Sequence, residues 1–188
     1  SNLLIKLSKD KFSRELFEAI FPQIKNIKIF LNLNEFAIKK IQEKDFIFLL
    51  SVLIIDGSDN ADYFIYKYNI SKTDKKRLKI LDDFFKNKSF SEKNLNKLFY
   101  FEGKQSLMDV LSFKLFISKK IDKKLLNLIY YYKSKDPPIL PVNAKILMEK
   151  YNIPEGKNLG NKLKTIEEEW LNNNFKITEK QINKIVNF

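Results

Sequence analysis

One turn near the C-terminal end combines residue types that can bind an anion. From Leu140 to Trp170 the sequence predicts a short helix, a tight turn containing Gly156 and Gly160, and a longer helix. The candidate contacts in this element are Lys145, Gly156, Lys157, Asn158, Gly160, Lys162 and Lys164. Gly156 permits a positive φ in the turn, and Gly160 leaves room for a close approach. Free N–H groups at a helix N-terminus, together with ammonium groups, can hold a phosphate.

The order of charges along the longer helix supports this interpretation. Lysines near a helix N-terminus face the positive end of the dipole, which costs roughly a few tenths of a kcal/mol each. The acidic run Glu167-Glu168-Glu169 lies farther along, the reverse of what helix stability alone favours. A bound phosphate would reverse the sign of the effect. Helix-hairpin-helix-type modules hold a nucleic-acid backbone in this way without reading its bases. The structural alternative is that the two glycines bind nothing: one would cap the end of a helix, and the other would lie where two helices cross.

Several familiar catalytic and metal-binding chemistries lack their residues. The chain has no His and no Cys, which excludes His-based catalysis, thiolate chemistry and His or Cys metal ligands. Neither a Walker-type loop nor a Rossmann fingerprint occurs. Asp59 and Asp62 follow Gly57-Ser58, but a spacing of three at a helix start predicts capping rather than a Mg²⁺ site. We therefore assign no catalytic residue, metal ligand or cofactor to this chain.

The net charge of +12 and the pI of about 9.6 suggest a polyanionic partner. The alternative is compositional drift, because Arg occurs only twice while Lys, Asn, Ile and Phe abound, as in an AT-biased genome. Clustering of the lysines decides between the two. Tyr130, Tyr131 and Tyr132 cannot all face inward, so we expect Tyr130 or Tyr131 to be exposed, as in a platform for RNA bases.

Hydrophobic periodicity predicts an all-α fold, because no segment alternates with period two. Pro137 and Pro138 mark the clearest boundary, so we expect a helical body over residues 1–135 and a helical tail, which would bind RNA, over 136–188. No apolar run approaches the ~20 residues of a membrane span, and we expect a cytoplasmic protein with no membrane contact. Ser1-Asn2 can be a cleavage scar, with further sequence upstream.

The body should contain a succession of amphipathic helices and one helix that is apolar nearly all round. In the first half of the body we expect helices over residues 9–21 (capped by Ser8), 24–33, 35–41 (capped by Asn34), 44–55 (the apolar helix) and 60–68 (capped by Ser58 or Asp59). In the second half we expect helices over residues 72–87 (capped by Ser71) and from Ser91 to Gly103, one with a buried stripe at Leu107, Leu111 and Leu115, and one that Asp122 begins. The tail should add 143–151, one from the Gly156 turn to about 174 with its buried stripe at Leu159, Leu163, Ile166 and Trp170, and one after Thr178.

Two stretches carry a family pattern. The matching tail residues are Leu140-Pro141-Val142, Lys145, Leu147, Ile153, Gly156, Leu159-Gly160, Leu163, Ile166-Glu167 and Trp170. They resemble the C-terminal region of bacterial class II (CCA-adding) tRNA nucleotidyltransferases and poly(A) polymerases. Residues 8–16 are similar to the segment that opens the helices after that family's neck. Ala144, Ile146 and Lys157 depart from the pattern, where Gly, Asp and Pro are usual.

The resemblance implies a division of labour within a longer protein. The family's catalytic head, a β-sheet with an Asp-x-Asp pair, is not in this chain, so we expect the chain to be inactive alone. That head would use Mg²⁺ with ATP or CTP to extend an RNA 3′ end, while the body and tail hold the RNA, tRNA being the expected partner. Two alternatives stay open: a stand-alone helix-hairpin-helix-like nucleic-acid-binding domain, and a protein-interaction domain.

Overall fold

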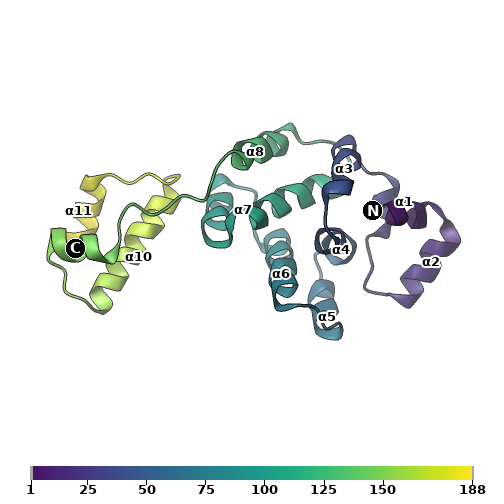
Figure 1. Cartoon of the computed structure of the whole chain (residues 1–188), viewed down its shortest axis with the longest axis horizontal. Helices are drawn as coiled ribbons and strands as arrows, with labels where there is room; N and C mark the ends of the chain where they lie inside the picture. The colour runs from purple at the N-terminus through teal and green to yellow at the C-terminus, as the bar shows by residue number, and fades with distance from the viewer. Residues whose placement is uncertain (1, 188) are drawn as a thin grey trace. The chain divides into compact units, whose positions relative to one another are not determined.

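The computed structural model describes residues 2–187, and within them it contains helices and connecting loops but no strand (Figure 1). The predicted all-α fold is confirmed. The helices are α1 (Asn2–Lys9), α2 (Lys11–Ile20), α3 (Glu35–Lys40), α4 (Phe46–Ile54), α5 (Asn60–Lys67), α6 (Lys72–Asn87), α7 (Glu92–Ile117), α8 (Lys123–Lys133), α9 (Ala144–Tyr151), α10 (Lys157–Asn172) and α11 (Glu179–Asn187), with 3-10 turns η1 (Ile27–Leu31) and η2 (Ile41–Glu43). Ser1, half of the suspected cleavage scar, lies outside the described residues.

The chain divides into two compact units. The N-terminal unit comprises Ser1–Ser89 and Lys104–Lys135, and the C-terminal unit comprises Phe90–Gly103 and Asp136–Phe188. One division falls directly before Asp136-Pro137-Pro138, the expected boundary. Residues 90–103, however, group with the tail rather than with the body. The change of unit within α7 occurs at Gly103, whose backbone (φ 80, ψ 179) is not helical, as expected of the residue that closes the Ser91 helix.

The core of the N-terminal unit is built around α4. Every residue from Phe48 to Ile54 is buried, because this helix carries apolar side chains on nearly all of its sides. This confirms the prediction that it is the most buried helix of the body. Helix α6 packs against α4 and α5, and α1 packs against α2. Phe116 of α7 contacts Phe48, with ring centroids 5.0 Å apart.

The C-terminal unit has its own core, in which α10 packs against α9 and α11. The buried members of this core are Val142, Leu147, Ile153, Leu159, Ile166, Ile182 and Val186. Trp170 of α10 is also buried, with Tyr100 and Phe175 about its ring at centroid distances of 5.2 and 5.0 Å. The predicted stripe of the long helix is confirmed at Leu159, Ile166 and Trp170, while Leu163 is half-buried.

Most predicted helix starts are confirmed by their side-chain hydrogen bonds. Asn34 accepts from the N–H of Ala37, and Asn143 accepts from the N–H of Ile146. Asp122 and Thr178 likewise accept from N–H groups in the first turns of α8 and α11. At α5 the acceptor is Ser58, which accepts from the N–H of Asn60, while Asp59 makes no side-chain cap. These starts depend on residues within one helical turn, which is why the sequence predicts them.

The prediction was wrong at the N-terminal end. Residues 2–9 form a helix of their own, so Ser8 lies inside α1 and its hydroxyl donates to the carbonyl of Ile5. Asp10 begins α2 instead, accepting from the N–H of Ser13 at 2.7 Å. The expected inner stripe of α2 is also exposed, at Phe12, Leu16, Ala19 and Ile20. The opposite side is half-buried, and there Arg14 donates to the carbonyl of Ser8. Farther on, segment 24–33 contains a 3-10 turn rather than an α-helix.

Candidate nucleic-acid interface

The Gly156 turn is open to solvent. Helix α9 ends at Tyr151, the next residue, Asn152, adopts the left-handed conformation (φ 54), and the side chain of Ile153 is buried in the core. Gly156 has φ 146 and directly precedes α10. A Cβ added at Gly156 or Gly160 would meet no atom within 4 Å. The structural alternative is therefore wrong for the cap, since Asn152 rather than Gly caps α9, and among the described residues no atom packs within 4 Å of a Cβ built at Gly160.

Three of the candidate residues share one face of α10. Lys157, Gly160 and Lys164 follow one another at helical spacing, and all three are exposed. Gly160 and Lys164 line an open groove of about 520 Å³, which also includes Tyr100, Asn143 and the segment 138–140. Asn158 is exposed on a different side of the same turn. The first-turn N–H groups of α10 have no side-chain cap and are directed toward this open end.

Lys162 does not belong to this face, contrary to the prediction. Its ammonium group donates to the carbonyl oxygens of Ile185 and Val186, at 3.2 and 2.7 Å. These carbonyls belong to the last turn of α11, where a cation meets the negative end of the helix dipole. Lys145 also lies elsewhere, exposed on α9 with its Nζ 3.8 Å from Glu149 Oε1. The structure thus brings Lys157, Gly160 and Lys164 together and leaves Lys145 and Lys162 apart.

The positive charge is concentrated in the N-terminal unit. Its residues include 25 Lys and Arg and 14 Asp and Glu, a net charge of +11. The C-terminal unit has 10 Lys and 9 Asp and Glu, a net charge of +1. Lysines are frequent in both units, and the units differ in net charge because acidic residues balance nearly all of the lysines only in the C-terminal unit. The tail expected to bind RNA is thus nearly neutral, and any wide electrostatic surface belongs to the body.

Helix α6 carries a regular row of lysines that the sequence analysis did not single out. Lys72, Lys75, Lys76 and Lys79 are exposed at positions i, i+3, i+4 and i+7 and therefore share one face. Lys72, Lys75 and Lys79 make no ion pair with any described residue. The spacing is visible in the sequence Lys-Thr-Asp-Lys-Lys-Arg-Leu-Lys, so periodicity applied to charge rather than to apolar residues would have found it.

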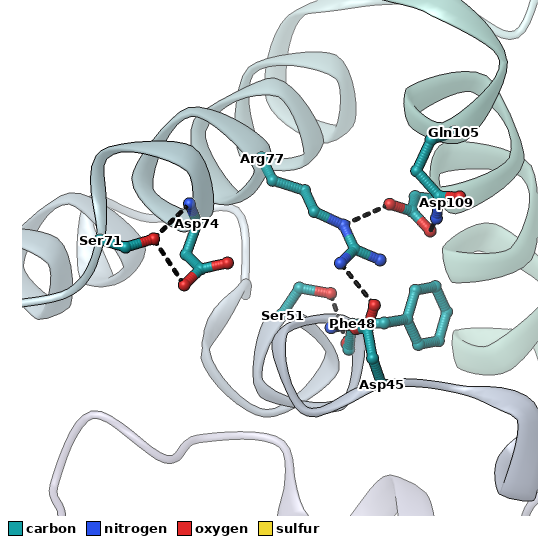
Figure 2. Close-up of polar contacts among 8 residues, drawn as sticks. All are labelled: Asp45, Phe48, Ser51, Ser71, Asp74, Arg77, Gln105 and Asp109. Carbon is teal, nitrogen blue, oxygen red and sulfur yellow. Dashed lines mark hydrogen bonds and ion pairs between the residues drawn. The ribbon is translucent and has the colours of Figure 1, made fainter.

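The opposite side of α6 is anchored by Arg77 (Figure 2). Its Nε donates to Asp109 Oδ2 on α7, and its Nη1 donates to Asp45 Oδ2 at the start of α4, both at 2.6 Å. Asp109 is almost fully buried and also accepts from Gln105 Nε2. Burial opposes the charges of Arg77 and Asp45. The hydrogen bonds outweigh it, so that the pKa of Arg77 is raised and the pKa of Asp45 is lowered.

The start of α6 is held by hydrogen bonds between Ser71 and Asp74, which Figure 2 also shows. The N–H of Asp74 donates to Ser71 Oγ at 3.1 Å, and the Ser71 hydroxyl donates to Asp74 Oδ2 at 2.7 Å. Together with the bonds of Arg77, these contacts fix the rotation of α6 about its axis. The lysine row is therefore presented to solvent by a helix that is anchored on its other side.

The acidic residues near the Gly57 turn form ion pairs. Lys86 Nζ lies 3.6 Å from Asp59 Oδ1, 3.7 Å from Asp62 Oδ2 and 2.7 Å from Asp82 Oδ2. Burial raises the pKa of Asp82, even though Lys86 acts in the opposite direction. Among residues 2–187 no group of three or more Asp and Glu side chains is placed to hold a metal ion. In the same range no helix has the length and hydropathy needed to cross a membrane.

Comparison with known proteins adds no relative from which a role could be transferred. The geometry described above and the sequence pattern therefore carry the functional argument. No protein-family model, curated protein or solved structure matches this chain.

Proposed function

We propose that this chain binds RNA, with tRNA as the expected partner. On this proposal it forms the body and tail of a class II tRNA nucleotidyltransferase or poly(A) polymerase. It would position the RNA 3′ end for a catalytic head outside the chain, which would hold Mg²⁺ and ATP or CTP. The family part of the proposal rests on the tail pattern from Leu140 to Trp170. The binding part rests on one observation, the concentration of +11 charges in the N-terminal unit.

The row on α6 is the clearest example of that concentration. Lys72 and Lys79 are separated by about 10 Å along the helix axis, a length over which several phosphates of one strand pass. Three ammonium groups without an acidic partner remain available to replace the counterions that phosphates carry. Such contacts position a nucleic acid without reading its sequence, which suits a region that must accept many tRNAs.

The α10 tip would form a second, local contact. Lys157 lies in the uncapped first turn, and Lys164 lies about two turns farther along the same face. A single phosphate could therefore accept from the free N–H groups and from the Lys157 ammonium group. Because the C-terminal unit is nearly neutral overall, this contact should add less to the salt dependence of binding than the α6 row does. Replacing Lys157 by Glu should weaken tRNA binding moderately.

The test is tRNA binding measured by fluorescence anisotropy over a range of salt concentrations. For the wild-type chain, affinity should fall steeply as salt rises. For the triple variant Lys72→Gln, Lys75→Gln, Lys79→Gln, the slope of log affinity against log salt should decrease by about 2 to 3, since each phosphate contact contributes about 0.7 to 0.9. Competition with duplex DNA separates tRNA binding from general nucleic-acid binding.

A matched control removes the same amount of charge from the other unit. Lys93, Lys176 and Lys180 are exposed, and replacing all three by Gln should leave the salt slope close to that of the wild-type chain. Wild-type binding that does not respond to salt would contradict the proposal. Equal effects of the two triple variants would show that overall charge, rather than the α6 row, is responsible.

A further inference from the structure

The outer face of α8 combines lysines with exposed aromatic rings. We define the α8 face as Lys123, Lys124, Asn127, Tyr130 and Tyr131, all of which are exposed. Their spacing places them on one side of the helix (Figure 1 shows α8). The inner side is buried at Leu125, Ile129 and Tyr132. Because that inner side fixes the rotation of the helix, the α8 face must point to solvent.

Both tyrosines of the face are well exposed, 68% for Tyr130 and 57% for Tyr131. Tyr131 packs edge-to-face on the buried Tyr132, with ring centroids 5.0 Å apart, so its ring is supported by the core. Lys135 Nζ lies 5.6 Å from the Tyr131 ring centroid. Large rings held in water beside ammonium groups offer a flat surface for another π-system.

The charged residues along the segment 119–135 are almost all positive. Lys119 and Lys120 precede the helix and are exposed, and with Lys123 and Lys124 they make no ion pair within the described part of the chain. The one carboxylate in this stretch, Asp122, is engaged as the helix cap and accepts from the N–H of Lys124 at 2.8 Å. The face is therefore complementary to a ligand that is both anionic and aromatic.

Helix α5 shows the contrast within the same unit. Tyr63 and Tyr66 are also exposed, at 54% and 89%, but Asp59 and Asp62 lie on or beside the same helix. Exposed rings alone are ordinary on a protein surface. Helix α5 has the single exposed lysine Lys67 together with two carboxylates, whereas α8 has four lysines at and before its first turn. The number of lysines therefore distinguishes α8 from α5, and α5 supplies a matched control.

We propose that the α8 face binds unpaired nucleotides of an RNA strand. The rings of Tyr130 and Tyr131 would stack on bases, and Lys123 and Lys124 would contact the flanking phosphates. Bases in a duplex are hidden by their own stacking, so aromatic platforms of this kind suit single strands and loops. The inference rests on the proposed function, since it names which part of an RNA this unit receives.

The experiment compares two labelled strands of equal length by fluorescence anisotropy. One is a single-stranded oligoribonucleotide of mixed sequence, and the other has the same backbone with its bases removed. The wild-type chain should bind the base-bearing strand more tightly. The double variant Tyr130→Ala, Tyr131→Ala should lose about tenfold or more in affinity for that strand and change little toward the abasic strand. Tyr130→Phe, Tyr131→Phe should bind like the wild-type chain, because the rings remain.

The control is Tyr63→Ala, Tyr66→Ala, which should leave both affinities unchanged. If the wild-type chain binds both strands equally, stacking is absent and the inference is wrong, whatever the stability of the variants. If the base-bearing strand binds the Tyr130, Tyr131 variant as tightly as wild type, the inference also fails, while the proposed RNA binding stands. If the wild-type chain binds neither strand nor tRNA at low salt, the proposed function fails as well.

Discussion

Lys162 and Lys164 stand two residues apart on α10, yet their ammonium groups have different surroundings. Lys164 is exposed beside Gly160, whereas Lys162 is half-buried and bonded to the last carbonyls of α11. A helix turns about 100° per residue, so two positions that are close in sequence can face a partner helix and solvent. Lys162 is therefore a stabilising residue, and Lys164 is a candidate for binding.

Replacing Lys162 by Met should lower the free energy of unfolding of the C-terminal unit by about 1 kcal/mol. The change keeps the apolar stem and removes the ammonium group that satisfies the α11 carbonyls. Urea unfolding followed by the fluorescence of Trp170 measures this effect. Lys164→Met, at an exposed position of the same helix, is the control and should leave the unfolding midpoint unchanged. Equal midpoints for the two variants would show that the Lys162 bonds contribute nothing.

Tyr100 should stabilise the C-terminal unit at neutral pH and lose this effect in strong alkali. Its hydroxyl donates to Glu167 Oε1 at 2.8 Å, and burial together with this carboxylate raises the pKa of Tyr100 to about 12 from 10.0. The pKa of Tyr100 is thus higher in the folded than in the unfolded chain. The stability that the protonated hydroxyl contributes is therefore complete below about pH 10 and is lost as the pH rises toward 12. The stability difference between wild type and Tyr100→Phe should therefore shrink over this range, as measured by urea unfolding at several pH values. A constant difference would argue against the hydrogen bond.

At the scale of elements, capping residues and glycines account for where helices begin and where they are interrupted. Ser71 with Asp74 begins α6, and Gly103 interrupts α7. Helix α2 shows the limit of such signals, because its apolar stripe is regular and nevertheless exposed. An amphipathic pattern says that a helix has an apolar side, but the rest of the fold decides which side finds a partner.

Gly103 should tolerate no other residue without loss of stability. Its φ of 80 and ψ of 179 belong to a region that side-chain-bearing residues rarely adopt, although a Cβ there would meet no atom within 4 Å. The cost of Gly103→Ala is thus one of backbone conformation, about 1 to 3 kcal/mol. Thermal or urea unfolding followed by circular dichroism checks it, with Gly160→Ala, inside α10 and equally unobstructed, as the control that should be neutral or slightly stabilising. If Gly103→Ala costs no more stability than Gly160→Ala, the backbone conformation of Gly103 is not what makes this position sensitive.

At the scale of the whole molecule, two units of similar helical build differ sharply in charge. The N-terminal unit holds nearly all of the net positive charge, and the C-terminal unit is close to neutral. Repulsion among like charges lowers the stability of a compact state, and salt screens it. Trp170, the single Trp of the chain, lies in the C-terminal unit and reports on that unit by itself.

Salt should therefore stabilise the two units unequally. When NaCl is raised from about 0.05 to about 0.3 M, the screening length falls to a few ångströms. The urea midpoint measured by circular dichroism, to which the larger N-terminal unit contributes most helices, should rise more than the midpoint measured by Trp170 fluorescence. Equal shifts would show that the lysines of the N-terminal unit do not repel one another appreciably.

The sequence by itself determined the all-α class, the caps of α3, α6 and α8, the burial of α4 and the break at Gly103. Each of these depends on residues within about one helical turn, or on the apolar content of one segment. The tertiary structure alone decided that Lys162 turns to α11, that the stripe of α2 faces water, and that Tyr130 and Tyr131 are both exposed. Those outcomes depend on which distant segments cover a given side of a helix, and no local pattern contains that information.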